Sequence, residues 1–131
     1  MHITLEADYA VRIVNCLAQN RVRMDAKSLS AATGVTLRFS LKILRKLVAE
    51  GIVRSYKGTQ GGYELAKEPQ EISLGQVIES VEGPITISRC VGTEEFQCTR
   101  VRERSECRFN RTYAEIAQMV RERLYAVHFG E

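Results

Sequence analysis

Apolar residues recur at helical spacing along residues 36–51. Leu37, Leu41, Leu44 and Val48 follow one another at intervals of four, three and four residues. Side chains at such intervals share one face of an α-helix. The pattern therefore predicts a helix over this stretch, with these four side chains in the core.

The remaining faces of this helix carry positive charge. Arg38, Lys42, Arg45 and Lys46 lie there, Phe39 stands beside them, and no acidic residue interrupts the group. A charged outer face is most often a solvated helix surface. A helix that buries one apolar face and shows several cations elsewhere is also suited to a polyanion such as nucleic acid.

The segment before the basic helix predicts another helix and a tight turn. Residues 26–33 are mostly small, Gly34 can take a positive φ angle, and Thr36 can cap the basic helix. This is the helix-turn-helix pattern, whose second helix enters the major groove of DNA. Further upstream, residues 4–19 predict a first helix with Thr4 as its N-cap.

The residues after the basic helix predict a β-hairpin. Residues 52–56 and 62–65 have strand composition, and the glycine-containing segment 57–61 between them has turn composition. A hairpin in this place is a wing. Three polar side chains of its turn suit contacts with phosphates or groove edges: Lys57, Thr59 and Gln60.

The rest of the chain predicts two helices on either side of an irregular segment. Residues 72–81 form a short amphipathic pattern with Ser73 as N-cap, and residues 110–128 form a long one. Few other elements remain to cover the long helix, so we expect it to be a dimerisation element. The expected fold class is mainly α with a small β-hairpin wing.

Three regions divide the expected fold. A winged helix-turn-helix DNA-binding domain spans residues 1–84, a cysteine-bearing sensor loop residues 85–109, and a dimerisation helix residues 110–131. Residues 1–66 hold ten Lys and Arg against five Asp and Glu, whereas the remaining residues hold nine against eleven. The positive excess in the first part favours nucleic acid as its partner.

Composition excludes several classes of function. No charged-then-apolar leader opens the chain, and no apolar run approaches the roughly 20 residues that span a bilayer. We therefore expect a cytoplasmic protein with no membrane partner. There is no phosphate-binding loop and no Ser-His-acid set, and two histidines are too few for most acid–base catalysis. We do not expect an enzyme.

Three of the four cysteines fall within the irregular segment: Cys90, Cys98 and Cys107. Seven and eight residues separate them, and the Cys-x-x-Cys spacing of zinc fingers and redox pairs is absent. In a reducing compartment, clustered thiols bind a soft metal or sense redox state, and inert thiols are the third interpretation. Cys16 lies on the apolar face of the first helix and should be a small buried residue.

Specific motifs accompany these cysteines. They are Asp-Tyr-Ala at residues 8–10, Gly-x-x-Gly-Gly-Tyr-x-Leu-Ala at residues 58–66 and Val-Glu-Gly-Pro at residues 81–84. Together they resemble the Rrf2 family of bacterial winged-helix transcriptional regulators, which includes the IscR, NsrR and CymR types. The resemblance implies a homodimer whose two basic helices enter successive major grooves of a near-palindromic double-stranded DNA operator.

The resemblance also gives candidate roles to individual side chains. The candidates for groove contacts are Arg38, Phe39, Ser40, Lys42 and Lys46. The candidates for phosphate contacts are Ser28, Arg45, Lys57, Thr59 and Gln60. Phe39 could touch a thymine methyl group, or instead pack on the wing or the first helix.

The resemblance to the IscR and NsrR types implies that Cys90, Cys98 and Cys107 ligate an iron–sulfur cluster, of either the 2Fe-2S or the 4Fe-4S type. The gaps between the cysteines are wider than in most cluster-binding members. IscR-like members would have a histidine ligand where this chain has Asn110, a poor iron ligand. NsrR-like members use an acid from the partner's first helix, and Asp8 stands at the matching place.

A cluster held in this way would make DNA affinity respond to cluster loss, oxidation or nitrosylation. His2 and His128 lie near the chain ends, and we do not expect either to be a ligand. Two alternatives keep the DNA-binding fold without a metal. One is regulation by thiol oxidation, and the other is regulation by a protein partner, which the resemblance to the CymR type allows.

Overall fold

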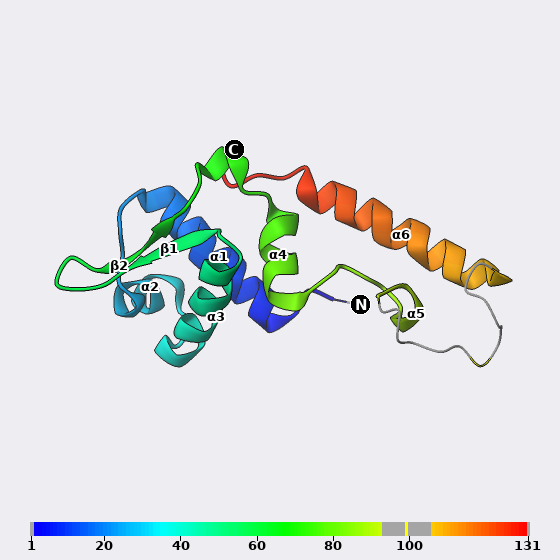
Figure 1. The fold of residues 1–131 in the computed structure, drawn as a ribbon, viewed down its shortest axis with the longest axis horizontal. Coiled ribbons are helices and arrows are strands. Elements are labelled where there is room, and N and C mark those ends of the chain that lie inside the picture. Colours follow the sequence, from blue (N-terminus) through cyan, green and yellow to red (C-terminus); the bar gives the residue numbers. More distant parts are fainter. Residues whose placement is uncertain (1, 93–98, 100–105, 131) are drawn as a thin grey trace.

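The computed structural model describes residues 2–92, 99 and 106–130. Figure 1 shows a group of helices with a hairpin at one end and a long helix extending from the other. The predicted fold class, mainly α with a two-stranded wing, is confirmed. The elements in chain order are α1 (Leu5–Asn20), α2 (Ala26–Thr33), α3 (Leu37–Ala49), β1 (Val53–Tyr56), β2 (Gly62–Leu65), the 3-10 helix η1 (Pro69–Glu71), α4 (Leu74–Glu82), α5 (Arg89–Gly92) and α6 (Arg108–Tyr125).

Local residues determine where the helices begin and end. The side chains of Thr4, Thr36 and Ser73 accept hydrogen bonds from main-chain N–H groups at the starts of α1, α3 and α4, which confirms these three predicted N-caps. Asp25 caps α2 in the same way. Gly34 ends α2 with a φ angle of 79°, a left-handed conformation that costs glycine little. The tight turn of the helix-turn-helix follows from this residue.

The core lies where α1, α3 and α4 meet, beside the base of the wing. Each of these helices contributes one apolar face. Fully burying a Leu, Ile or Val side chain stabilises a fold by about 1.5–3 kcal/mol. The largest fully buried side chains include Ile13, Leu17, Leu29, Ile43, Leu44, Leu47, Ile52 and Val77.

The face that α3 buries differs from the predicted one. Ile43, Leu44 and Leu47 are fully buried, whereas Leu37 and Leu41 are 44% and 40% exposed. The prediction that Leu37 and Leu41 lie in the core is therefore wrong. The helix has apolar residues on two overlapping faces that share Leu44, and its packing against both α1 and α4 selects the face with Ile43 and Leu47.

The wing is an antiparallel pair of four-residue strands, with Val53 opposite Leu65 and Tyr56 opposite Gly62. Tyr63 also exchanges main-chain hydrogen bonds with Met24, at 2.9 and 2.7 Å, so the chain between α1 and α2 lies along the second edge of β2. Gly62 has a φ angle of 136°, and a Cβ atom there would lie 2.8 Å from the Met24 carbonyl oxygen. Only glycine fits this close approach.

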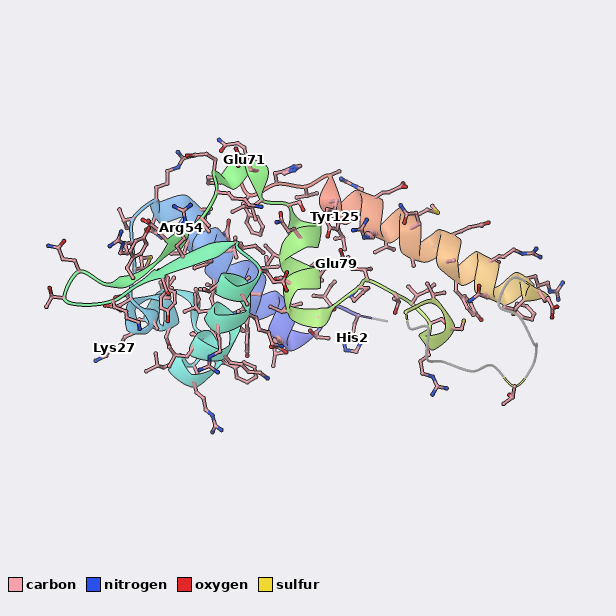
Figure 2. The ribbon with its side chains drawn as sticks, in the orientation of Figure 1. His2, Lys27, Arg54, Glu71, Glu79 and Tyr125 are labelled. Atoms are coloured by element: carbon pink, nitrogen blue, oxygen red, sulfur yellow. The ribbon has the colours of Figure 1, made fainter. Side chains whose placement is uncertain are left out.

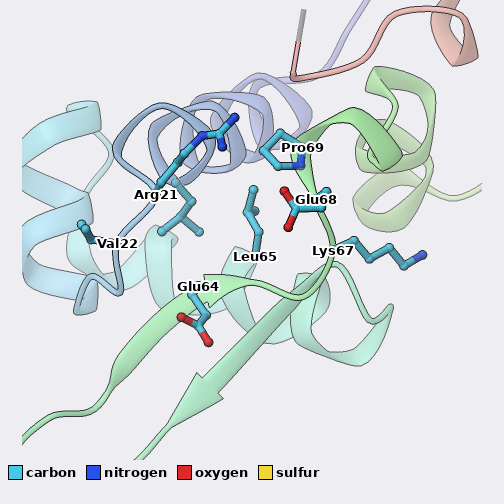
Figure 3. Close-up of a pocket in the computed structure, with 8 residues that line it drawn as sticks. Arg21, Val22, Glu64, Leu65, Lys67, Glu68 and Pro69 are labelled. Carbon is cyan, nitrogen blue, oxygen red and sulfur yellow. The ribbon is translucent and has the colours of Figure 1, made fainter.

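A shallow hollow of about 250 Å³ lies between the end of α1 and the chain that follows β2 (Figure 3). Leu17 and Pro69 in its lining are buried, while Arg21, Lys67 and Glu68 are exposed. Arg21 has a φ angle of 53°, in the left-handed region, where it ends α1. The hollow therefore marks the point where the chain leaves α1 and turns toward the wing.

The long helix α6 packs on α4 near its own C-terminal end and extends away from the rest of the fold (Figure 1). Tyr125 of α6 faces Glu79 of α4 (Figure 2). Ala117 is the one buried residue of this helix. The predicted helix over residues 110–128 is confirmed, although it ends at Tyr125. None of the described helices combines the length and the apolar composition that spanning a bilayer requires.

Candidate nucleic-acid interface and cysteine segment

The face of α3 that points away from the core is basic. Arg38, Lys42 and Arg45 are exposed, and together with Phe39 and Leu41 they line a surface hollow of about 630 Å³. Arg38 and Arg45 form no ion pair with any other described residue. Exposed cations without acidic partners, on the second helix of a helix-turn-helix, are suited to phosphates and base edges.

Phe39 packs on the first helix. Its ring meets the ring of Tyr9 edge to face, with 5.5 Å between the centroids. Lys42 Nζ, on the same helix as Phe39, lies 5.7 Å from the Phe39 centroid. Edge-to-face pairs contribute about 0.5–1.5 kcal/mol beyond the burial of their area. Phe39 is still 36% exposed. Phe39 therefore makes the expected contact with the first helix and keeps part of its ring exposed on the basic face, so the contact with a thymine methyl group stays a prediction.

The ammonium group of Lys46 points toward α1 and α4. Its Nζ donates to Glu6 Oε1 at 2.8 Å and to the Val81 carbonyl at 3.3 Å, and Lys42 Nζ lies 3.9 Å from the same Glu6 oxygen. The sequence of α3 has no acidic residue among these cations, but the fold brings Glu6 of α1 next to two of them. Lys46 thus joins α3 to α1 and α4 in this structure.

Ser40 and Ser28, two of the candidate DNA contacts, have different surroundings. Ser40 is fully buried, and its hydroxyl donates to the Val35 carbonyl at 3.4 Å. A groove contact from Ser40 does not fit this burial, because its hydroxyl would have to leave the core. Ser28 is exposed at the start of α2, where its N–H donates to Asp25 Oδ1 at 2.7 Å.

The three candidate residues of the wing turn are exposed: Lys57, Thr59 and Gln60. The turn closes through a hydrogen bond from the Gly61 N–H to the Gly58 carbonyl at 3.0 Å. Arg23, which precedes α2, contacts this turn through the Gln60 carbonyl. Sequence reasoning missed Arg23, because its partners lie more than thirty positions away along the chain and no local pattern indicates them.

Two of the three candidate cysteine ligands lie on neighbouring segments. Cys90 in α5 and Cys107 at the N-cap of α6 are each 6% exposed. Asn110 connects them, since its N–H donates to Cys107 Sγ at 3.4 Å and its side-chain amide donates to the Cys90 carbonyl at 3.2 Å. Cys98 lies outside the described residues. The described residues contain no group of three His, Cys, Asp or Glu side chains close enough to hold a metal ion.

Asp8, the candidate fourth ligand, lies on α1. Its carboxylate pairs with Arg12 of the same helix at 3.0 Å, and its side chain is 47% exposed. The structure does not bring Asp8 together with Cys90 and Cys107 in a described group of ligands. Cys16 is half-buried against the core, with its Sγ 4.0 Å from Met24 Sδ and 3.5 Å from the Asn20 side-chain nitrogen, so the predicted burial is incomplete.

An apolar groove of about 780 Å³ separates α6 from the rest of the fold. Its other walls are α4, the segment that follows α4, and the start of α1. Side chains of Ile78 and Val81 line it from α4, and Ile116 and Val120 line it from α6. Ile116 and Val120 are 41% and 38% exposed. The long helix therefore carries an apolar face that its own chain covers only in part.

Comparison of the sequence with known protein families shows which family the chain belongs to. The Rrf2 family, described as iron-dependent transcriptional regulators, matches residues 3–131. The chain belongs to the Rrf2 family. The resemblance inferred from the sequence is thereby confirmed, and the family is one of transcriptional regulators, as expected, and not of enzymes.

Two relatives of this Rrf2 protein illustrate the similarity. A Mycobacterium tuberculosis protein, named as a candidate HTH-type transcriptional regulator, is 37% identical over 94 residues, which cover 70% of this chain and 58% of the relative. The HTH-type transcriptional regulator IscR of Pectobacterium atrosepticum is 30% identical over 99 residues, which cover 74% of this chain and 60% of that protein. The matched regions thus span about three-fifths of these relatives.

Among solved structures, CymR, the global cysteine regulator of B. subtilis, superimposes with a TM-score of 0.75. It is 23% identical, and the match covers 98% of this chain and 93% of that one. At this identity the likeness shows the fold alone. It confirms that the Rrf2 winged-helix fold extends through α6.

Proposed function

We propose that this Rrf2 protein is a homodimer that binds a near-palindromic DNA operator through α3 and the wing, with an iron–sulfur cluster controlling its DNA affinity. One observation carries the first part of the proposal. Arg38 and Arg45 are exposed on the second helix of the helix-turn-helix and have no acidic partner among the described residues. A polyanion would supply the missing negative charge.

The proposed contacts follow the exposure of the candidate residues. Arg38 and Lys42 would reach base edges in the major groove, because they lie on the exposed face of α3. Leu37 and Leu41 expose apolar surface on this helix and could meet thymine methyl groups. The remaining exposed candidates would contact phosphates: Ser28, Arg45, Lys57, Thr59 and Gln60.

The homodimer would form through α6. Its partly exposed apolar residues line one side of the apolar groove, and Ile78 and Val81 of α4 line the other side. A second copy of α6 matches this groove in chemistry, since it carries the same apolar face. In such a dimer, Ile116 and Val120 would be buried, and the two α3 helices would be held at a fixed separation.

The cysteine segment fits an iron–sulfur cluster in the chemistry of its donors. Iron–sulfur clusters are held by thiolates, and Cys90 and Cys107 are thiols on segments joined through Asn110. We propose Cys98 as the third ligand and Asp8 of the partner subunit as the fourth. When bound, the cluster would supply a centre sensitive to oxidation and nitric oxide. This chain's own residues would fix the start of α6 beside α5.

A second candidate function is regulation by thiol oxidation without a metal. The burial of Cys90 and Cys107 and their connection through Asn110 are compatible with a disulfide between two of the three cysteines. Both proposals divide the chain at residues 84 and 109 into DNA-binding, sensor and dimerisation regions. Both also place the protein in the cytoplasm.

One experiment separates the proposals. We would purify the full chain without oxygen, record its visible spectrum with iron and sulfide analysis, and select an operator from random DNA duplexes. Broad absorption with matching iron and sulfide, lost in Cys98→Ala, together with different operator affinities of the holo and apo forms, is the expected result. Equal affinities of the two forms would rule out the cluster as the signal. Failure to select any operator would overturn DNA binding.

A further inference from the structure

Arg23 connects the chain between α1 and α2 to the far end of the wing. Its guanidinium carbon lies 3.4 Å from the centroid of the Tyr56 ring, so the two planar groups are in contact. Its Nη1 donates to the Gln60 carbonyl at 3.0 Å, and its Nη2 lies 3.6 Å from Glu64 Oε1. One side chain therefore contacts β1, the turn and β2.

The base of the wing packs on α1 and α3, whereas its turn has few other described contacts that would fix its direction. Each strand has four residues, and a short two-stranded hairpin is only marginally stable in water by itself. Met24 pairs with Tyr63, near the middle of β2. The turn residues Lys57, Thr59 and Gln60 lie beyond that pairing and are exposed. Arg23 is the described side chain that bonds to the main chain of this turn.

We infer that Arg23 is a positioning residue for DNA binding, which fixes the wing turn so that Lys57, Thr59 and Gln60 face the DNA together. The inference rests on the proposed binding of DNA by α3 and the wing. Direct phosphate binding by Arg23 is the competing role. The contacts present oppose it, because one face of the guanidinium covers Tyr56 and its terminal nitrogens are directed to Gln60 and Glu64.

Substitution by lysine distinguishes these roles. Lys keeps the positive charge but lacks the planar group that stacks on the ring and the fork that donates in two directions. We expect Arg23→Lys and Arg23→Ala each to weaken binding to the selected operator about tenfold. If Arg23 bound a phosphate directly, Arg23→Lys would keep most of the affinity. That result would overturn the inference.

The ring partner gives an independent variant. Tyr56→Leu removes the stacking surface without changing charge, and we expect it to weaken binding by about the same factor as Arg23→Ala, with little further loss in the double variant. Tyr56→Phe keeps the ring and serves as its matched control. Arg21→Asn controls for loss of a nearby positive charge, because Asn tolerates the left-handed conformation there. Additive losses in the double variant would contradict the inference.

A measurement without DNA separates this inference from the proposed function. Hydrogen exchange at the Gly61 amide, which closes the turn, should become faster in Arg23→Ala and Arg23→Lys than in the parent chain. Unchanged exchange in both variants would overturn the positioning role, even if binding were weakened. If exchange accelerates and the parent chain binds no DNA, the proposed function fails and Arg23 still orders the wing. We also expect Lys57→Ala to weaken DNA binding in the parent chain and to have little further effect in Arg23→Ala.

Discussion

The hydroxyl of Tyr125 donates a hydrogen bond to the carboxylate of Glu79, across the contact between α6 and α4 (Figure 2). The same carboxylate accepts from the Ile85 N–H at 2.9 Å and lies 3.3 Å from a guanidinium nitrogen of Arg121. Glu79 therefore ties both the long helix and the chain leading to α5 to the DNA-binding module.

Stability should depend on the ionisation of Glu79. Burial by itself would raise the pKa of Glu79, but hydrogen bonds from Tyr125, Ile85 and Arg121 together hold this pKa below its ordinary 4.5. The ionised carboxylate therefore stabilises the fold fully above the unfolded-state pKa, and this stabilisation is lost as the pH falls through the lowered native pKa. Glu79→Gln should lower the free energy of unfolding by about 1–3 kcal/mol at neutral pH.

Urea unfolding at pH 7 and at about pH 4 would check this prediction. The difference between the parent chain and Glu79→Gln should shrink at the lower pH. Glu115→Gln, an exposed position on α6, is the matched control and should change stability little. A difference that stays constant with pH would show that the charge of Glu79 is not responsible.

Glu6 should limit the affinity of the protein for DNA in general. Its carboxylate lies 2.8 Å from Lys46 Nζ and 3.9 Å from Lys42 Nζ, so it offsets charge on α3. Glu6→Gln should raise non-specific DNA affinity several-fold and steepen its dependence on salt, because the cations then face only phosphates. Titration of a mixed-sequence duplex at several salt concentrations measures both. Glu50→Gln, at the end of α3, is the control, and an unchanged salt slope for Glu6→Gln would count against the prediction.

Asn110 should hold Cys90 and Cys107 in place. Its amide group donates to the Cys90 carbonyl, and its N–H donates to Cys107 Sγ. Asn110→Ala should therefore increase the rate at which a thiol reagent modifies Cys90 and Cys107, by about tenfold. Cys16 in the same sample gives an internal reference. Equal rates in the two proteins would mean that Asn110 does not order this segment.

The apolar face of α6 should be required for dimerisation. Val120→Glu places a charge on a surface that the proposed dimer buries, so it should convert the dimer to monomers at micromolar concentration. Sedimentation velocity measures the change, and circular dichroism at the same time tests that α6 remains helical. Gln118→Glu, an exposed position on the same helix, should leave the dimer intact. A monomeric parent protein would refute the proposed interface.

The exposed leucines of α3 should recognise thymine methyl groups. Leu41 is 40% exposed among cations that would bring it to the major groove. Replacing thymine by uracil in the selected operator removes only the methyl group, and it should weaken binding of the parent chain a few-fold at one or more positions. The Leu41→Ala variant should be insensitive to uracil at the same position. Equal sensitivity of the two proteins would exclude Leu41 as the contact.

Several features of this protein could be predicted from local sequence. Thr4, Thr36 and Ser73 were identifiable as N-caps because capping depends on a residue and its next three neighbours. The glycine-containing turn between two short strands specified the wing, and the motifs around it indicated the family. The fold class, the helix-turn-helix and the long final helix all follow from such short-range information.

The tertiary structure decided which faces and partners these elements use. Leu37 and Leu41 are exposed and Ser40 is buried because packing against α1 and α4 selects one of two overlapping apolar faces on α3. Glu6 offsets Lys46, and Arg23 contacts Gln60, across separations of about forty residues in the chain. Helical and strand periodicity describes one element at a time, whereas ion pairs and stacking between elements depend on how the chain folds back on itself.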